Sequence, residues 1–337
     1  MPINRHGHAH SNNKTHKRNA VQNKIKSQQR FLTMRCSPAA RKKSAGLHTT
    51  CFSPEVIELI RKEYNKDHPD DVINGGTPLA VWKQLNARLM GKCSTEDCWL
   101  DKIDDANLRK KIDAYFFAPD QPKEWEKKPN FWLSNIEIKK VMDQYEVAYP
   151  EFEFMGPTPI DYDAANKSNG NKCVDMQMCE LDLAKEMAKG KRKFGVVFNL
   201  SKQGTYGSHW VALYADLVEN LIFFFDSNGD KQNAQIEEFM RKIESQAAAL
   251  GHKLKRVNNL GWRHQNEDTE CGMYSMYFLI TMLTGKPSGE EKEAMPFKKR
   301  MNMFLTQKIS DKYVRMYRKI YFNSRESGTY GLSAVGH

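Results

Sequence analysis

An apolar stretch with almost no polar interruption sets the strongest constraint on how this chain can fold. It runs from Cys271 to Leu283, reads CGMYSMYFLITML, and is followed by Gly285. A helix that is apolar all round has to be buried on every side, and a glycine just beyond the last apolar residue is a common helix stop. The stretch is too short to span a bilayer. We therefore predict a central helix that other elements cover.

Three apolar segments before this helix predict a sheet. Residues 194–200 read FGVVFNL, a continuous run typical of a buried strand. Residues 209–217 and 221–226 are two further strands, and the short gap between them favours an antiparallel hairpin. A helix at 233–250, a strand near 253–257 and one or two helices at 297–322 complete the pattern. This is an α+β fold, with a mixed, mostly antiparallel sheet flanked by helices.

The chain before this region predicts a tail and an extra N-terminal helical region. Residues 1–50 contain eleven Lys or Arg and no Asp or Glu, and such a polar segment of one charge sign is expected to be disordered. Ser53-Pro54 and Thr77-Pro78 are helix starts, and 108–117 is a third helical segment. We expect four parts: a basic tail at 1–50, a helical arm region at 51–125, the core at 126–325 and a C-terminal tail at 326–337.

A further helix is expected where the core begins. The preceding segment 118–130 holds three prolines and is typical of a connector. Ser134 and Glu137 then form the signature of a capping box. Ile136, Val141 and Tyr145 recur at helical spacing, so we expect them to face the core.

The charge of the chain is concentrated in its tail. The sequence has 52 basic and 41 acidic residues, and because the tail 1–50 contributes eleven basic residues and no acidic ones, the rest carries no net charge. Contact with nucleic acid is therefore expected, if anywhere, through the tail. The alternatives are that the tail is a nuclear localisation signal or only a solvated segment.

The seven cysteines predict free thiols in a reducing compartment, because the count is odd and no signal peptide precedes them. Cys93 with Cys98, and Cys173 with Cys179, lack the spacing and the second pair of a zinc site. We expect no metal, no cofactor and no membrane association, and an intracellular protein.

Cys271 is the first candidate for chemistry, since it opens the buried helix. The positive end of the helix dipole points at its sulfur and favours the thiolate. Gly272 beside it is expected to leave room for a substrate backbone. The alternative is that Cys271 is simply a small residue of the core.

His209 and Asp226 supply the groups that a cysteine nucleophile needs. His209 begins one strand of the expected hairpin and Asp226 ends the other, so both lie at its open end. There a carboxylate can orient an imidazole that acts as general base. A structural histidine and an aspartate in ordinary turn chemistry are the alternatives; Asp216 and Asn228 are weaker candidates for the acidic partner.

Gln265 precedes the cysteine in a loop, where a neutral amide donor can stabilise an oxyanion. Together the four residues resemble the ubiquitin-like-protein (SUMO) protease and adenain superfamily of cysteine proteases. The features that match are the His209-Trp210 pair, Asp226 seventeen residues after the histidine, Gln265 six residues before the cysteine, and a helix that starts with Cys271-Gly272. The segment WLSNIEIKKVM at 132–142 is similar to the first helix of these proteases.

The phrases HWVALYADL, FFFDSNG and ECGMY are more similar to the polyprotein-processing proteases of large nucleocytoplasmic DNA viruses than to cellular deconjugating enzymes. Those viral relatives carry an extra helical arm, which residues 52–120 can supply. Glu270 departs from the family, which commonly has aspartate before the cysteine. Papain-like enzymes are excluded because they place cysteine before histidine, and chymotrypsin-like viral cysteine proteases are excluded because their cysteine lies between strands.

The resemblance implies an adenain-like protease core with a His209-Asp226-Cys271 triad and Gln265 in the oxyanion hole. It also implies that Trp210 walls a narrow substrate channel and that cleavage follows Gly-Gly-type sequences. Maturation of a viral polyprotein, in host cytoplasm and virion, is the first expected process. Removal of SUMO or another ubiquitin-like modifier, with a nuclear location, is the alternative. A protein of another class, a non-cleaving nucleic-acid-binding module, is the third possibility.

Overall fold

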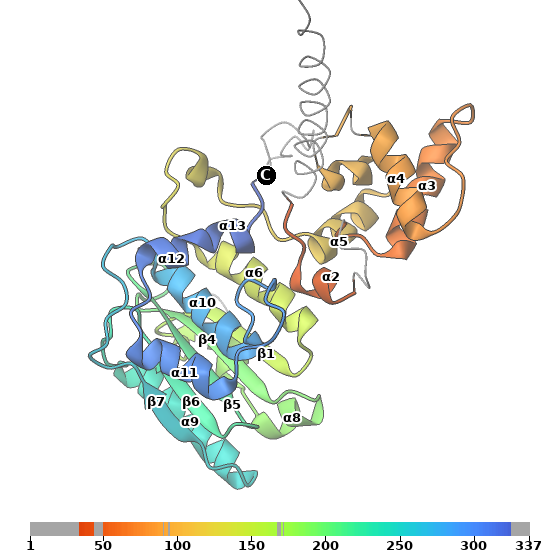
Figure 1. The fold of residues 1–337 in the computed structure, drawn as a ribbon. Coiled ribbons are helices and arrows are strands. Elements are labelled where there is room, and N and C mark those ends of the chain that lie inside the picture. Colours follow the sequence, from red (N-terminus) through yellow and green to blue (C-terminus); the bar gives the residue numbers. More distant parts are fainter. Residues whose placement is uncertain are drawn as a thin grey trace, which may run out of the picture. The chain divides into compact units, whose positions relative to one another are not determined.

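The computed structural model describes residues 34–43, 50–89, 91–93, 95–166, 170 and 172–324 (Figure 1). These residues form two compact units. We call residues 50–117 the arm unit and residues 118–324, with 37–42, the protease unit. Most of the predicted tail 1–50 and all of 326–337 lie outside the described residues.

The arm unit is helical, as the proline-marked helix starts predict. Its elements are α3 (Pro54–Asp67), α4 (Pro78–Leu89), the 3-10 helix η1 (Glu96–Lys102) and α5 (Ala106–Phe116). Its core is built on Phe52, whose ring meets Trp99, Phe116 and Phe117 at centroid distances of 6.3, 6.0 and 5.1 Å. Ten residues, 68–77, connect α3 to α4.

The protease unit is built on a five-stranded mixed sheet in the order β1-β4-β5-β6-β7. The two central pairings are antiparallel, and the two edge strands pair in parallel with their neighbours. The strands are β1 (Phe152–Pro159), β4 (Lys193–Asn199), β5 (Trp210–Asp216), β6 (Leu221–Phe225) and β7 (Lys255–Asn258), with a separate short pair β2 (Ala165–Asn166) and β3 (Lys172–Cys173). The expected α+β class and mixed sheet are confirmed, with antiparallel pairings making up half of the sheet.

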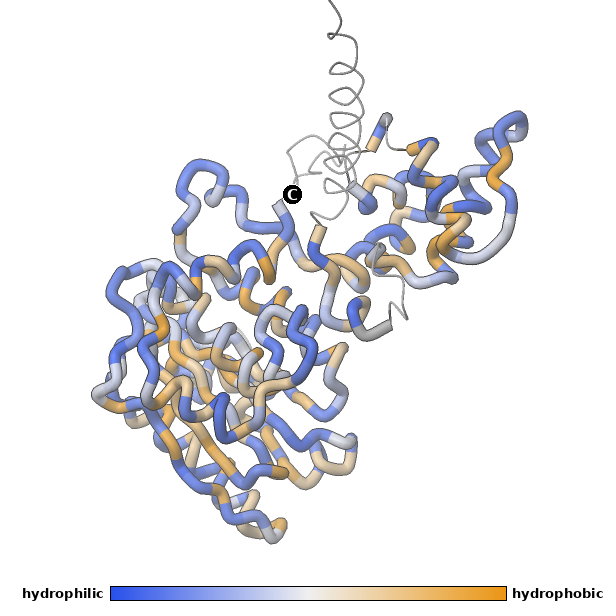
Figure 2. Tube along the Cα trace, in the orientation of Figure 1, coloured by the Kyte–Doolittle hydropathy of each residue, from blue (hydrophilic) through white to orange (hydrophobic). Residues whose placement is uncertain are grey.

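Helices cover both faces of this sheet, because its central strands are apolar at nearly every position. Alternate residues of β5 and β6 belong to two separate clusters, one with α10 and α6 and one with α9. Figure 2 shows the hydrophobic residues concentrated along the strands and α10. The helices are α2 (Pro38–Lys43), α6 (Asn135–Ala148), α7 (Met176–Cys179), α8 (Leu183–Ala188), α9 (Ala234–Ala249), α10 (Cys271–Thr284), α11 (Phe297–Thr306), α12 (Asp311–Met316) and α13 (Arg318–Tyr321), with the 3-10 helix η2 (Lys123–Glu126).

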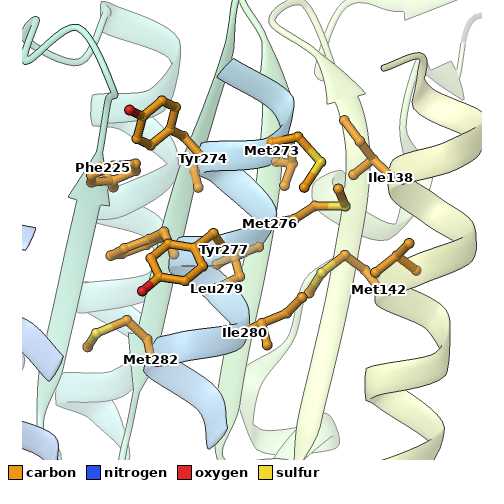
Figure 3. Packing of buried hydrophobic residues seen from close by; sticks show 14 of the residues in the cluster. Ile138, Met142, Phe225, Met273, Tyr274, Met276, Tyr277, Leu279, Ile280 and Met282 are labelled. Atoms are coloured by element: carbon orange, nitrogen blue, oxygen red, sulfur yellow. The ribbon is translucent and has the colours of Figure 1, made fainter. Parts of the chain in front are cut away.

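Helix α10 is the predicted central helix, and all of its residues are buried. It lies on the sheet, and its Met273 and Met276 point toward Ile138 and Met142 of α6 (Figure 3). Gly285 ends it in the left-handed conformation, with a φ of 64°. The nucleophile candidate is therefore fixed to the most thoroughly packed element of the unit.

Three sequence expectations are corrected by the structure. Ile136 does not face the core: it is 56% exposed, whereas Ile138 is fully buried, because α6 begins at Asn135 and turns its first residues to solvent. The segment 297–322 forms three helices rather than one or two. Strand β1 was not expected at all.

The expectation of free thiols is also wrong for six of the seven cysteines. They form the disulfides Cys36–Cys51, Cys93–Cys98 and Cys173–Cys179. Their Cα atoms lie 5.2, 5.6 and 6.5 Å apart, within the range that a disulfide bridges without moving the backbone. Cys271 is the free cysteine.

Candidate active site

The hairpin of β5 and β6 brings His209 and Asp226 together at its open end. His209 immediately precedes β5, Asp226 immediately follows β6, and the register pairs Ala212 with Phe225 next to them. His209 Nε2 donates to Asp226 Oδ1 over 2.7 Å. The carboxylate is itself buried and fixed, since its Oδ1 also accepts from the backbone N–H of Asn228 at 2.8 Å.

The charge state of His209 is set by its neighbours. Burial lowers the pKa of His209, but hydrogen bonds to Asp226 and Cys271, together with the charges of both groups, raise it to about 10. The imidazole is therefore held as imidazolium at neutral pH. A positively charged ring therefore lies beside the Cys271 side chain.

Cys271 lies at the first residue of α10 and is 3% exposed. The helix that carries it is buried along its whole length, which gives the sulfur a fixed position. The free N–H groups at a helix N-terminus point toward this end and favour negative charge there. His209 and the helix end therefore act on the sulfur in the same direction.

Gln265 is buried, and both the oxygen and the nitrogen of its side-chain amide make hydrogen bonds. Its Oε1 accepts from Ser227 Oγ at 2.7 Å, and its Nε2 donates to the carbonyl of Glu267. The backbone N–H of Gln265 donates to the Ser227 carbonyl at 2.9 Å. An amide carries two N–H donors, and the bond to Glu267 uses one of them.

The loop from Gln265 to Cys271 is anchored by a carboxylate from α12. Asp311 is buried and accepts from the backbone N–H of Asn266 at 3.0 Å and from Tyr274 Oη at 3.1 Å. It therefore ties the loop that carries Gln265 to the helix that carries Cys271. Sequence analysis did not identify this residue, because it lies forty residues after Cys271 and carries no motif.

A buried ion pair connects the residue before Cys271 to the segment at 131–133. Glu270 is fully buried, and its two oxygens accept from Arg318 Nε at 2.9 Å and from Arg315 Nε at 3.1 Å. Arg318 Nη1 also donates to the carbonyl of Phe131 at 2.9 Å, and its guanidinium lies 4.1 Å from the Trp125 ring. We call Glu270, Arg315 and Arg318 the ionic latch; sequence reasoning missed both arginines.

A cleft of about 960 Å³ runs beside this segment. Its walls come from 131–135, the end of β1, and the loop 199–208 that leads to His209. Trp210 lines the cleft, and its Nε1 donates to the Leu133 carbonyl at 3.1 Å. Trp132 lines it as well and is 41% exposed.

Gly272 is packed more tightly than expected. A Cβ at this position would lie 3.3 Å from both Leu133 and Trp210. The space beside Gly272 is therefore filled by these two side chains rather than left open for a substrate backbone. Because the cleft wall lies this close to α10, a residue without a side chain fits best at position 272.

The two weaker candidates for the acidic partner, Asp216 and Asn228, lie at opposite ends of the hairpin. Asp216 lies at the other end of the hairpin, where it caps the turn at Val218 and Glu219 and accepts from Tyr214. The side-chain amide nitrogen of Asn228 lies 3.4 Å from His209 Nε2, but the histidine Nε2 already donates to Asp226 over the shorter distance. The geometry therefore favours Asp226.

No group of three or more metal-ligating side chains occurs within the described ranges. In the same part of the chain, each helix is too short or too polar to cross a membrane.

Comparisons with known proteins identify similar cysteine proteases. The Ulp1 protease family, C-terminal catalytic domain, matches residues 197–320, which include all four predicted catalytic residues. A protein of Acanthamoeba polyphaga mimivirus that is named as a thiol protease is 29% identical over 308 residues, covering 83% of this chain and 91% of the viral protein. A cysteine protease of African swine fever virus is 24% identical over 223 residues, or 60% of this chain and 79% of its own length.

The fold matches a solved structure as well. The crystal structure of a protease from African swine fever virus aligns with a TM-score of 0.55 and 17% sequence identity, covering 87% of this chain and 97% of that protein. The match supports the predicted α+β core with its N-terminal helical region. This chain is a cysteine protease, and its residues 197–320 match the catalytic domain of the Ulp1 protease family.

Proposed function

We propose that Cys271 is the nucleophile, His209 the general base and acid, Asp226 its orienting partner and Gln265 the side-chain donor of the oxyanion hole. The observation that supports this most strongly is the 2.7 Å bond between His209 and Asp226, next to the free cysteine at the start of α10. Because Asp226 occupies Nε2, Nδ1 is the nitrogen left for the thiol. Asp226 thus fixes both the ring orientation and the tautomer.

The reaction follows from this arrangement. The Cys271 thiolate attacks the carbonyl carbon of the scissile peptide, and the charge that forms on the oxygen meets the free N–H of Gln265 and the backbone amides at the start of α10. The His209 imidazolium then protonates the leaving amine. Water, deprotonated by the same ring, hydrolyses the thioester and releases the new carboxylate.

We propose substrates with Gly-Gly before the cut. The cleft supports this, because Leu133 and Trp210 close over Gly272 directly beside the nucleophile, which limits the room for side chains near the scissile bond. Trp132 and Trp210 provide flat apolar walls on the approach. Processing of a polyprotein at such sequences is the function that we favour.

Removal of a ubiquitin-like modifier is the second candidate. The observation in its favour is that the matching proteins of several African swine fever virus isolates are named SUMO-1 cysteine proteases. A folded modifier and an unfolded polyprotein segment present the same chemistry at the scissile bond. The two kinds of substrate differ in how much of their own surface lies outside the cleft.

Two electrophilic probes, a Gly-Gly peptide and a ubiquitin-like modifier, each carrying a thiol-reactive group, would test the proposal. We expect the peptide probe to label the wild-type protein and the Cys271→Ala variant to stay unlabelled. Asp216→Asn is the matched control, since Asp216 lies at the far end of the hairpin, and it should be labelled like wild type. Labelling of the Cys271→Ala variant would show that the nucleophile is assigned incorrectly, and faster labelling by the modifier probe would favour the second candidate.

A further inference from the structure

The loop between α3 and α4 in the arm unit holds Gly75 and Gly76, the only adjacent glycines in the sequence. Residues 74–80 are all exposed. A Cβ at Gly75 would meet no atom within 4 Å, and one at Gly76 would meet only Ala80, at 3.7 Å. Within the described part of the chain, neither glycine makes a backbone hydrogen bond to another residue. The peptide bond that follows Gly76 is therefore accessible to another molecule.

We propose that this protease cleaves its own chain between Gly76 and Thr77, acting on a second copy of itself. The inference rests on the proposed function, because it applies the Gly-Gly preference of the cleft to the protein's own sequence. Among the described loops, this one combines that sequence with full exposure. Exposed loop tips are also the preferred places for proteolytic nicking of folded proteins.

The step is ordinary peptide hydrolysis. The Cys271 sulfur of one copy bonds to the carbonyl carbon of Gly76 in the other, and the bond to the Thr77 nitrogen breaks as His209 protonates it. Water then hydrolyses the thioester and restores the thiol. The products are residues 1–76 with a new carboxylate and residues 77–337 with a new amino group, which together exceed the intact chain by one water.

The structure also indicates what limits this cleavage. Ile73, three residues before Gly76, is fully buried. Its N–H donates to Asn65 Oδ1 at 2.8 Å, and its carbonyl accepts from Asn65 Nδ2 and Arg61 Nη1, each at 3.0 Å. These bonds hold the loop against α3 and resist its entry into a cleft. Self-cleavage should therefore be slow, and loosening this anchor should accelerate it.

The two products are not linked covalently. The disulfide Cys36–Cys51 lies within 1–76, and the other two lie within 77–337. Noncovalent packing of α3 on α4 can keep the pieces together in native solution. Denaturing conditions, with no reductant required, separate them for measurement.

The experiment uses the full-length Cys271→Ala chain as substrate and a small amount of wild-type protein as enzyme. Intact-mass analysis under denaturing conditions over time should show the fragments 1–76 and 77–337. Gly76→Val in the substrate should reduce the rate at least tenfold, because a branched side chain cannot pass between the cleft walls. Gly91→Val, at another exposed glycine of the arm unit with no atom within 4 Å, is the matched control and should be cleaved at the unaltered rate. Asn65→Ala should be cleaved faster than the parent substrate.

A synthetic peptide covering residues 70–80 separates this inference from the proposed function. If the enzyme cleaves the peptide after Gly76 but leaves both the Cys271→Ala chain and its Asn65→Ala version intact, self-cleavage is refuted and the proposed specificity stands. If the enzyme turns over other peptides but not this one, the Gly-Gly preference fails and self-cleavage fails with it.

Discussion

Replacing Arg318 with methionine should destabilise the protein severely, because it removes the main partner of a buried carboxylate. The side chains of Arg318 and Glu270 are 5% and 0% exposed. Breaking a buried ion pair by removing one partner costs about 3–5 kcal/mol. Arg315 keeps its own bond to Glu270, so we expect the lower end of this range, about 3 kcal/mol.

Urea unfolding, followed in parallel by tryptophan fluorescence and far-ultraviolet circular dichroism, measures this effect. At a slope of about 2 kcal/mol per molar urea, the midpoint should fall by roughly 1.5 M. Both signals are needed because a chain with two compact units need not unfold in one step.

Two further variants make the interpretation specific to the ionic latch. Arg315→Met removes a guanidinium that is 29% exposed, so its cost should stay at about 1 kcal/mol or less. The double variant Arg318→Met with Glu270→Met removes both charges and should recover much of the loss, since no buried charge is left unpaired. A loss of less than about 1 kcal/mol for Arg318→Met alone would refute the reasoning.

Gln265→Ala should lower kcat about 10²–10³-fold with little change in KM, as expected for one oxyanion donor; an increase in KM alone, measured in peptide kinetics, would place Gln265 in substrate binding instead. Ser227→Ala should cause a smaller loss of kcat, because Gln265 then loses the 2.7 Å bond at Oε1 but keeps the bond from its Nε2, and a loss as large as that of Gln265→Ala would contradict this order. Asp226→Asn should move the alkaline limit of the pH–rate profile to lower pH, because Asp226 raises the pKa of His209, which is about 10 in the intact site. A pH–rate profile that is unchanged in Asp226→Asn would argue against the pair. The stability of the fold should depend on pH in the same direction. The contribution of charged His209 is complete below its unfolded pKa of about 6.5 and is lost as the pH rises through about 10.

Local sequence signals predicted much of the fold. Ser53-Pro54, Thr77-Pro78 and Ser134 mark helix starts that the structure contains, and the apolar run from Cys271 predicts α10 with its stop at Gly285. The hairpin placed His209 and Asp226 together because its register depends only on a short turn. These features depend on residues that are close together in the sequence.

Features that depend on distant parts of the chain could not be predicted. Strand β1 contains Gly156-Pro157, which breaks the apolar pattern by which strands are recognised, and its parallel partner β4 begins about forty residues later. Arg318 meets Glu270 across 48 residues and Phe131 across 187. No periodicity carries information about such contacts, and the same is true of the disulfide between Cys36 and Cys51.

The distance in sequence between the parts of the ionic latch also affects when the protease unit can complete its fold during synthesis. The arm unit and the residues of the proposed triad leave the ribosome before α13, which supplies Arg318 to both Glu270 and the Phe131 carbonyl. Until residue 318 has been translated, Glu270 lacks its main counter-ion and the cleft wall lacks one of its donors. A nascent chain that ends before residue 318 already contains Cys271, His209 and Asp226 but leaves the buried Glu270 carboxylate without its main partner, so the protease unit reaches its full stability only after α13 has been made.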